Sequence, residues 1–219
     1  MNQDNPTDPK EIKRIQRELK EQQFDPGPVD GILGQWTQKA IDYRKYSFER
    51  ELPVETKDKL IAISVRHIGR LNKSQSNTLC NNPNTVIQTD QVDSVPRKQV
   101  GWMYNVNFIR SCYEKAYEEQ PSPIVPLITS SKQMLENATW KQMSGGIPPL
   151  EGDVFGVYFN SLGELAHCGI ILEWPKTDKF FLTVEAAHND NYWPGKDGWP
   201  RICMKRRLKS DAFAIKRFL

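Results

Sequence analysis

Apolar positions near the start of the chain recur at the three- and four-residue spacing of an α-helix. This first apolar stripe consists of Ile12, Ile15 and Leu19. Asp8 and Pro9 precede the stripe, and these residue types favour the cap and the first turn of a helix. The run Asp25-Pro26-Gly27-Pro28 ends the helix, and a second short helix is predicted over residues 35–43.

Later segments change from a helical pattern to a strand pattern. Residues from Thr56 onward and residues 104–119 have apolar positions at helical spacing, so each segment is predicted to form a helix. After Gly145-Gly146 the chain continues in short apolar and β-branched runs, which favour strands. The predicted strands cover residues 154–159, 167–173, 180–185, 201–205 and 212–218. Helices followed by antiparallel strands predict an α+β fold, with helices packed on an antiparallel sheet.

These patterns divide the chain into four segments. We expect a disordered leader at residues 1–9 and a small all-α module at residues 10–50. A linker at residues 51–56 then leads to an α+β domain at residues 57–219. The total of 219 residues suits one small and one medium domain.

Composition and charge argue against two classes of partner. No apolar run approaches the roughly 20 residues that a membrane helix needs, and the polar N-terminus lacks the features of a secretory signal. The net charge of +3 and the single dense basic run, Lys205-Arg206-Arg207, do not favour nucleic-acid binding. We expect a solvated strand or loop at that run, synthesis in the cytoplasm, and neither a nucleic-acid partner nor a membrane span.

Residues 12–43 contain an ordered motif in addition to the helical periodicity. The motif consists of Ile12, Gln16, Leu19, Pro28-Val29-Asp30-Gly31-Ile32-Leu33-Gly34, Thr37 and Ala40-Ile41. In this order the residues resemble the bacterial peptidoglycan-binding three-helix module. Two positions depart from that family: Gln23 stands where glycine is common, and Arg44 stands where glutamine is common.

The resemblance implies binding to the glycan or the peptide stem of the cell wall, so peptidoglycan is the expected partner. Asp30, Trp36 and Tyr43 are the candidate ligand-binding residues. The loop chemistry also has a purely structural reading, because Asp30 can accept backbone N–H groups across its turn. Gly31 and Gly34 permit a positive φ in the same loop.

Five segments of the C-terminal part carry a second, looser resemblance. They are Ile68-Gly69 to Asn77, Pro149 to Val154, Ala166 to Ile171, Thr183 to Asn189, and Gly198 to Arg207. Together they resemble the CHAP and NlpC-type papain-like amidases and endopeptidases, especially the phage-associated ones. The resemblance implies a bacterial cell-wall hydrolase that cuts amide bonds with a cysteine thiolate and an imidazole. It makes His167 the catalytic base and Glu185 the residue that orients the base.

The nucleophile position of that family is occupied by an asparagine in this chain. Alignment of the helix that contains Phe108-Ile109 places Asn105 where the family has its cysteine. Asparagine cannot form a thiolate, but it is a good N-cap, and this gives it a structural role at the start of the predicted 104–119 helix. The resemblance therefore implies an enzyme fold whose hydrolysis is lost or impaired.

The four cysteines of the chain do not supply an obvious replacement. Cys112 is expected in the core, about two turns further along the helix face of Asn105. Cys168 follows His167 on a strand and is expected to point to the opposite face of the sheet. Cys80 lies in a predicted loop and remains the alternative nucleophile. No two cysteines have metal-ligand spacing, so we expect no metal and no other cofactor.

Three functions remain open from the sequence. The first is an active hydrolase, an endolysin or secreted effector, with an unrecognised or replaced cysteine nucleophile. The second is an inactive relative that binds wall fragments, and the third is a binding module joined to an unrelated α+β interaction domain. The missing cysteine favours the second, whereas the retained His167 and Glu185 favour the first. Each reading requires action at the cell wall after release or non-classical export.

Overall fold

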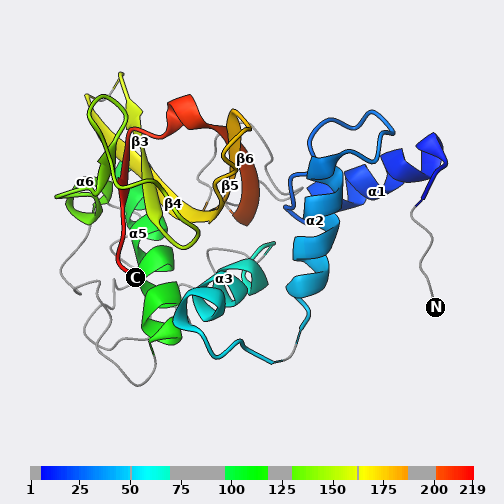
Figure 1. The fold of residues 1–219 in the computed structure, drawn as a ribbon, viewed down its shortest axis with the longest axis horizontal. Helices are drawn as coiled ribbons and strands as arrows, with labels where there is room; N and C mark the ends of the chain where they lie inside the picture. Colours follow the sequence, from blue (N-terminus) through cyan, green and yellow to red (C-terminus); the bar gives the residue numbers. More distant parts are fainter. Residues whose placement is uncertain (1–5, 50, 70–96, 118–129, 162, 187–200) are drawn as a thin grey trace.

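The fold is α+β, as the sequence predicts, with helices packed on one seven-stranded antiparallel sheet (Figure 1). A computed structural model describes residues 6–49, 51–69, 97–117, 130–161, 163–186 and 201–219. The helices are α1 (Pro9–Glu21), α2 (Gln35–Tyr46), α3 (Thr56–Arg66), α5 (Arg97–Ala116) and α6 (Ser131–Met134), with a 3-10 turn at Lys209–Asp211. The strands are β1 (Trp140–Lys141), β2 (Gly145–Gly146), β3 (Val154–Phe159), β4 (Glu164–Glu173), β5 (Phe180–Ala186), β6 (Ile202–Leu208) and β7 (Ala214–Lys216).

The sheet has the strand order β2-β1-β7-β3-β4-β5-β6. All five predicted strands are present, and strand β3 begins and ends at the predicted residues. The two-residue strands β1 and β2 were not predicted, because a pair of residues carries no readable alternation. Leu172, Val184 and Met204 belong to the larger buried cluster, which also includes residues of α3 and α5. Phe155 and Phe181 belong to a second, smaller cluster.

Helix α1 begins as the sequence predicts. The Asp8 side chain accepts a hydrogen bond from the backbone N–H of Lys10 at 3.0 Å, and Pro9 occupies the first helical position. Ile12 and Leu19 of the apolar stripe are buried. The N-terminal part is therefore organised by the capping and periodicity that its sequence shows.

Helix α5 corrects the sequence prediction at both ends. It begins at Arg97 rather than near residue 104 and ends at Ala116 rather than at residue 119. The segment before Asn105 contains Gly101, a weak helix former, and for this reason the predicted helix did not extend through it. Asn105 consequently lies inside the helix, and its predicted role as the N-cap is wrong.

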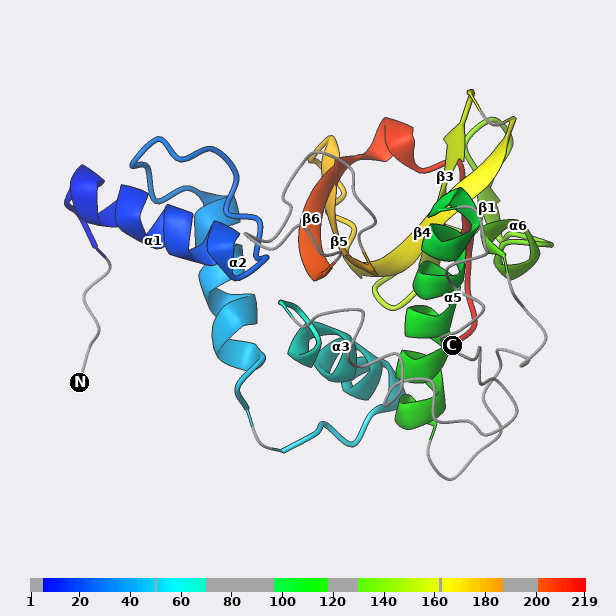
Figure 2. The ribbon, with the colours of Figure 1, turned by 180° about the vertical axis from the view of Figure 1, so that it is seen from behind.

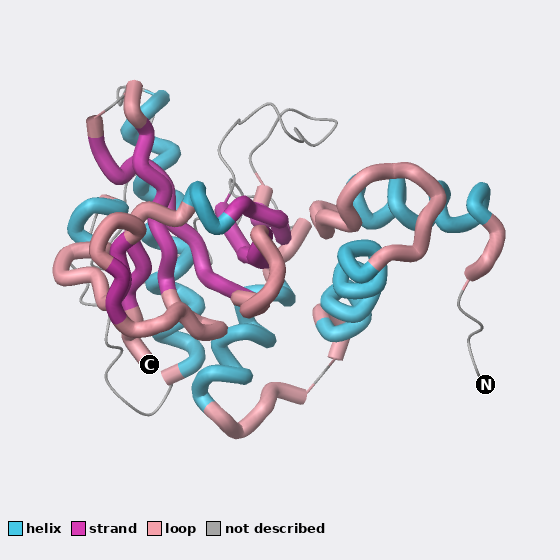
Figure 3. The backbone as a smooth tube through the Cα atoms, turned by 45° about the horizontal axis from the view of Figure 1, so that its top comes forward, coloured by secondary structure: helices cyan, strands magenta, loops and turns pink. Residues whose placement is uncertain are grey.

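The N-terminal helices lie beyond the β6 edge of the sheet, as the opposite views in Figures 1 and 2 show. The backbone N–H of Met204 donates to the Gln23 carbonyl at 2.9 Å. The backbone N–H of Arg206 donates to the Asp25 carboxylate at 3.2 Å. Leu19, Phe24 and Ala40 join the same buried cluster as the sheet residues. The small module and the larger domain are thus in direct contact (Figure 3).

Candidate functional site

The N-terminal motif residues form a buried network around the side chain of Gln16. Its amide nitrogen lies 3.1 Å from Asp30 Oδ1, 3.0 Å from the Ile32 carbonyl and 3.1 Å from Thr37 Oγ1. Its amide oxygen accepts the backbone N–H of Gly31 at 3.0 Å. Gln16 and Thr37 are nearly inaccessible to solvent, so the network fixes the loop between α1 and α2.

Asp30 takes part in this network as a turn residue. Its carboxylate accepts the backbone N–H of Ile32 at 2.9 Å, and this bond, together with the one from Gln16, lowers the pKa of Asp30. Gly31 has a φ of +83°, and a Cβ there would lie 2.7 Å from the Pro9 carbonyl. The Asp-Gly pair is therefore explained by loop geometry, and a ligand-binding role for Asp30 stays a prediction.

Gln23, one of the two departures from the resembled pattern, adopts a left-handed backbone conformation. Its φ is +70°, in the left-handed region where glycine is the least strained residue. A position that often carries glycine in the resembled family therefore has a conformation that favours glycine here. The Gln23 carbonyl is the one that accepts the N–H of Met204, so this strained turn directs the chain onto β6.

Trp36 and Tyr43 both lie where α2 meets the sheet domain. The Trp36 ring packs edge-on against Phe180, with 6.2 Å between ring centroids, and the Arg206 guanidinium lies 5.6 Å from the Trp36 centroid. Tyr43 forms a hydrogen bond with Glu173, and burial together with that carboxylate raises the pKa of Tyr43. The two aromatic residues thus have structural contacts between the two parts, and Trp36 also lines a cleft there.

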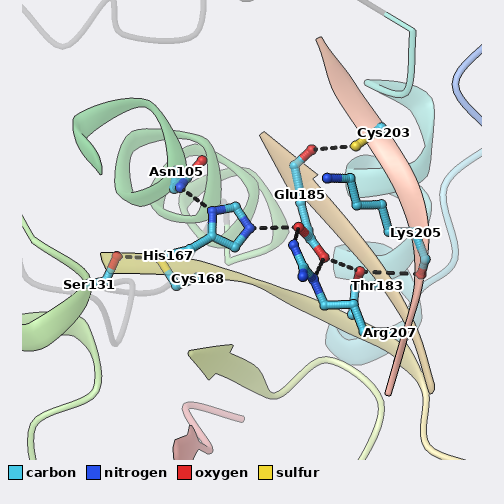
Figure 4. Close-up of polar contacts among 9 residues, drawn as sticks. All are labelled: Asn105, Ser131, His167, Cys168, Thr183, Glu185, Cys203, Lys205 and Arg207. Carbon is cyan, nitrogen blue, oxygen red and sulfur yellow. Dashed lines mark hydrogen bonds and ion pairs between the residues drawn. The ribbon is translucent and has the colours of Figure 1, made fainter. Parts of the chain in front are cut away.

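Asn105, His167 and Glu185 come together as one hydrogen-bonded row (Figure 4). Nδ2 of Asn105 lies 2.7 Å from Nδ1 of His167, and Nε2 of His167 lies 2.6 Å from Oε2 of Glu185. The imidazole comes from β4 and the carboxylate from the neighbouring antiparallel strand β5. The predicted geometry of these three residues is confirmed, except that Asn105 lies well inside α5 rather than in its first turn.

Glu185 is fully buried and has more partners than the sequence indicates. Nε and Nη2 of Arg207 each donate to its carboxylate at 2.5 Å, and the Thr183 hydroxyl donates at 2.5 Å. Burial alone would raise the pKa of Glu185, but the charges and hydrogen bonds of Arg207 and His167 outweigh it. They hold the pKa well below its ordinary value. The carboxylate is therefore ionised and held in a fixed orientation.

The ionised carboxylate determines which imidazole nitrogen carries the proton. A carboxylate only accepts hydrogen bonds, so Nε2 of His167 must donate and Nδ1 keeps its lone pair. The Asn105 amide donates to that lone pair. Burial lowers the pKa of His167, although the Glu185 charge acts in the opposite direction. The imidazole is thus neutral, with its basic nitrogen directed at residue 105.

The remaining atom of the Asn105 amide is unsatisfied. Its Oδ1 is buried and has no hydrogen-bond partner, and the whole residue is 2% exposed. An unpaired buried acceptor is costly and uncommon, and it is typical of sites kept for a purpose other than stability.

Gly169 provides the space that the row requires. A Cβ at this position would lie 2.8 Å from Cγ of Glu185 and 2.7 Å from Cε1 of Phe155. Contacts this short do not occur between real carbon atoms, so any larger residue would push Glu185 away from His167. The glycine two residues after His167 is a part of the site that its sequence neighbourhood could have indicated.

Arg207 was missed by the sequence prediction. The run Lys205-Arg206-Arg207 does lie on a strand, β6, but the expectation that it is solvated is wrong for Arg207. Its side chain is 18% exposed and is paired with the buried Glu185. A basic run on a strand looks solvated in sequence, and only the pairing of β5 with β6 reveals the partner.

The three described free cysteines lie in the core. Cys112 is fully buried on α5, as predicted, and burial raises its pKa. Cys168 is also buried, where the Ser131 hydroxyl lies 3.4 Å from its sulfur, and burial raises its pKa to about 12. Neither thiol forms a thiolate readily. Cys80, the alternative nucleophile, lies outside the described residues.

The row holds the Nδ1 atom of His167, a proton acceptor, against residue 105, but Asn105 has no acidic proton to give to it.

Within the described residues, no helix has both the length and the apolar character needed to cross a bilayer. The same part of the chain holds no group of three or more His, Cys, Asp or Glu residues placed to bind a metal ion. Comparison with known proteins finds no matching family model, curated protein or solved structure.

Proposed function

We propose that this chain recognises bacterial peptidoglycan and that its C-terminal part is a papain-like amidase domain without a working nucleophile. The observation that carries the proposal is the row Asn105–His167–Glu185, in which a base and its orienting carboxylate face an amide. The N-terminal motif supports the choice of ligand, because its residues form the closed network around Gln16 that would maintain such a module.

The geometry supports loss of hydrolysis rather than a substitute mechanism. Nδ1 of His167 is the atom that would deprotonate a nucleophile at position 105, and it instead accepts a bond from an amide. Residue 105 also lies eight residues after the start of α5, beyond the first turn in which a helix dipole stabilises an anion. Recognition without cleavage is therefore the proposed activity.

An active hydrolase is the second candidate, and the intact His167–Glu185 pair favours it. Such an enzyme would use a nucleophile from outside the described residues, with Cys80 as the candidate. The two functions differ in one measurable quantity, which is the release of new amino groups from purified peptidoglycan.

The test uses the whole chain and purified sacculi. We expect the protein to sediment with the sacculi and to release no amines, whereas Asn105→Cys releases a small amount and the matched Asn105→Ala releases none. The gain should be weak, because His167 has a lowered pKa and makes a poor base.

Two results would contradict the proposal. Absence of sedimentation at low salt would remove the recognition role. Amine release by the parent that disappears in Cys80→Ala, but persists in Asn105→Ala, would identify an active enzyme with Cys80 as its nucleophile.

A further inference from the structure

A cleft lies between helix α2 and the β4–β5 turn, away from the row around His167. Its volume is about 240 Å³, below the roughly 300–1,000 Å³ that is usual for sites enclosing a drug-sized ligand, so it would hold part of a longer ligand rather than surround one. Trp36 lines it from the N-terminal part, and Trp174 lines it from the sheet domain. None of Asn105, His167 and Glu185 contributes to its lining. The structure thus offers a second concave surface built jointly by both parts of the chain.

The two tryptophans are partly exposed and held in place. Trp36 packs against Phe180, and Trp174 packs against Phe181 with 4.7 Å between ring centroids. Rings fixed in this way present apolar surface without loss of side-chain entropy on binding. Such surfaces suit the C–H faces of sugar rings.

Polar groups around the rings favour hydroxyl and amide partners. Gln35 Nε2 donates to Asp178 Oδ2 at 3.0 Å, which fixes both side chains at the rim. The exposed residues Thr177 and Glu151 add a hydroxyl and a carboxylate. Carboxylates and amides with fixed positions can accept hydrogen bonds from sugar hydroxyls and acetamido N–H groups.

The charges around the cleft are largely balanced. Glu173 is paired with Lys39 and Glu151 with Lys57, and the Lys209 ammonium lies 5.1 Å from the Trp174 ring centroid. Balanced charges give no strong attraction to phosphate or to the free carboxylates of peptide stems. A neutral ligand that combines apolar ring faces with hydroxyls and amides fits best.

We infer that this cleft binds an uncharged run of N-acetylated sugar residues, the glycan part of the wall polymer. The inference rests on the proposed recognition of peptidoglycan and deepens it, because it names the part of the polymer and the residues that contact it. Since both tryptophans are needed, neither part of the chain alone would provide the site.

The test measures binding of the neutral tetramer of N-acetylglucosamine to the whole chain by calorimetry. Thr177→Trp fills the cleft without removing packing, and Lys176→Trp adds the same ring at the exposed neighbouring residue, which does not line the cleft. We expect Thr177→Trp to weaken tetramer binding by about tenfold or more, and Lys176→Trp to change it by less than about twofold. Unchanged melting temperatures would show that both variants are folded.

The outcomes separate this inference from the proposed function. If the parent sediments with sacculi but the tetramer does not bind, or binds Thr177→Trp equally well, the cleft assignment is overturned and wall recognition stands. If a soluble stem peptide displaces the protein from sacculi and the tetramer does not, the ligand class is wrong. If the parent binds the tetramer and Thr177→Trp does not, the cleft is supported even where sacculi are not retained.

Discussion

Two buried polar networks, one in each part of the chain, follow opposite principles. The network around Gln16 is uncharged at its centre and joins a helix to the loop that follows it. The network around Glu185 is charged and joins residues from α5, β4, β5 and β6. The first network holds the loop between α1 and α2 closed, whereas the second holds the His167 imidazole against Asn105.

The two networks differ in how many of their buried polar atoms have a hydrogen-bond partner. Both ends of the Gln16 amide have partners, as expected of a network whose role is stability. The Asn105 amide has a partner only at its nitrogen. The proposed amidase-like site rests on this incomplete satisfaction next to an oriented imidazole. Substitutions in the two networks should therefore have unequal effects on stability.

The largest effect is expected from Glu185→Ala. This substitution leaves the Arg207 guanidinium and the His167 Nε2–H without their shared acceptor, and breaking a buried charged pair costs about 3–5 kcal/mol. Chemical denaturation of parent and variant measures the difference in the free energy of unfolding. The control is Glu11→Ala on the exposed face of α1, where only a minor loss is expected because exposed ion pairs contribute little to stability. Equal losses in the two variants would show that the charged network does not stabilise the fold.

Gln16→Leu should have the next largest effect. It removes the acceptor of the Gly31 N–H and the donor to Asp30 and Ile32, so about 2 kcal/mol is expected from the groups left unpaired. Gln38→Leu is the matched control, because Gln38 makes an exposed bond to Asp42 within α2. A loss in Gln38→Leu as large as in Gln16→Leu would refute the structural role of the first network.

Acidification should destabilise the protein through the second network. His167 has a lowered pKa, so the unfolded chain binds its proton more readily and stability falls as the pH drops below about 6.5. Glu185 also has a lowered pKa, so a second loss begins below about 4.5.

The free energy of unfolding should fall by at most about 1.4 kcal/mol per pH unit for each proton taken up. It is read from the free energy of unfolding measured between pH 7 and pH 5. His167→Gln should flatten this part of the curve. A slope that persists unchanged in His167→Gln would assign the titration to another group.

Asn105→Leu should have the smallest effect and is the sharpest comparison with Gln16→Leu. The substitution leaves His167 Nδ1 without a donor, but it also removes the unpaired Oδ1 and improves helix propensity. These contributions nearly cancel, so a change within about 1 kcal/mol is expected in chemical denaturation. A loss of about 2 kcal/mol or more would mean that Asn105 serves stability in the way that Gln16 does.

Local features of the sequence predicted the local features of the structure. Asp8 and Pro9 precede an apolar stripe and start α1, and the short apolar and β-branched runs after Gly146 correspond to strands such as β3. The His167–Glu185 pair could be predicted for a similar reason, because both residues lie in short motifs on strands that are neighbours along the chain.

Features that depend on distant pairing were not predictable. Arg207 reaches Glu185 only because β6 pairs with β5 in a particular register. The contact of Trp36 with Phe180 and Arg206 requires the two parts of the chain to be docked. The long start of α5 also escaped prediction, since it begins with the polar run Arg97 to Gln99 and contains Gly101, a weak helix former.

The covering of β6 has a consequence for self-association. β6 ends the sheet, and its outward backbone groups are occupied by Gln23, by Asp25 and by Gly69, whose N–H donates to the Ile202 carbonyl at 2.8 Å. An uncovered edge strand is a template on which a strand of another copy can add. A chain cut within residues 51–56 and stripped of its helical part would expose much of this edge. The small N-terminal part therefore covers an edge of the sheet on which strand addition could otherwise occur.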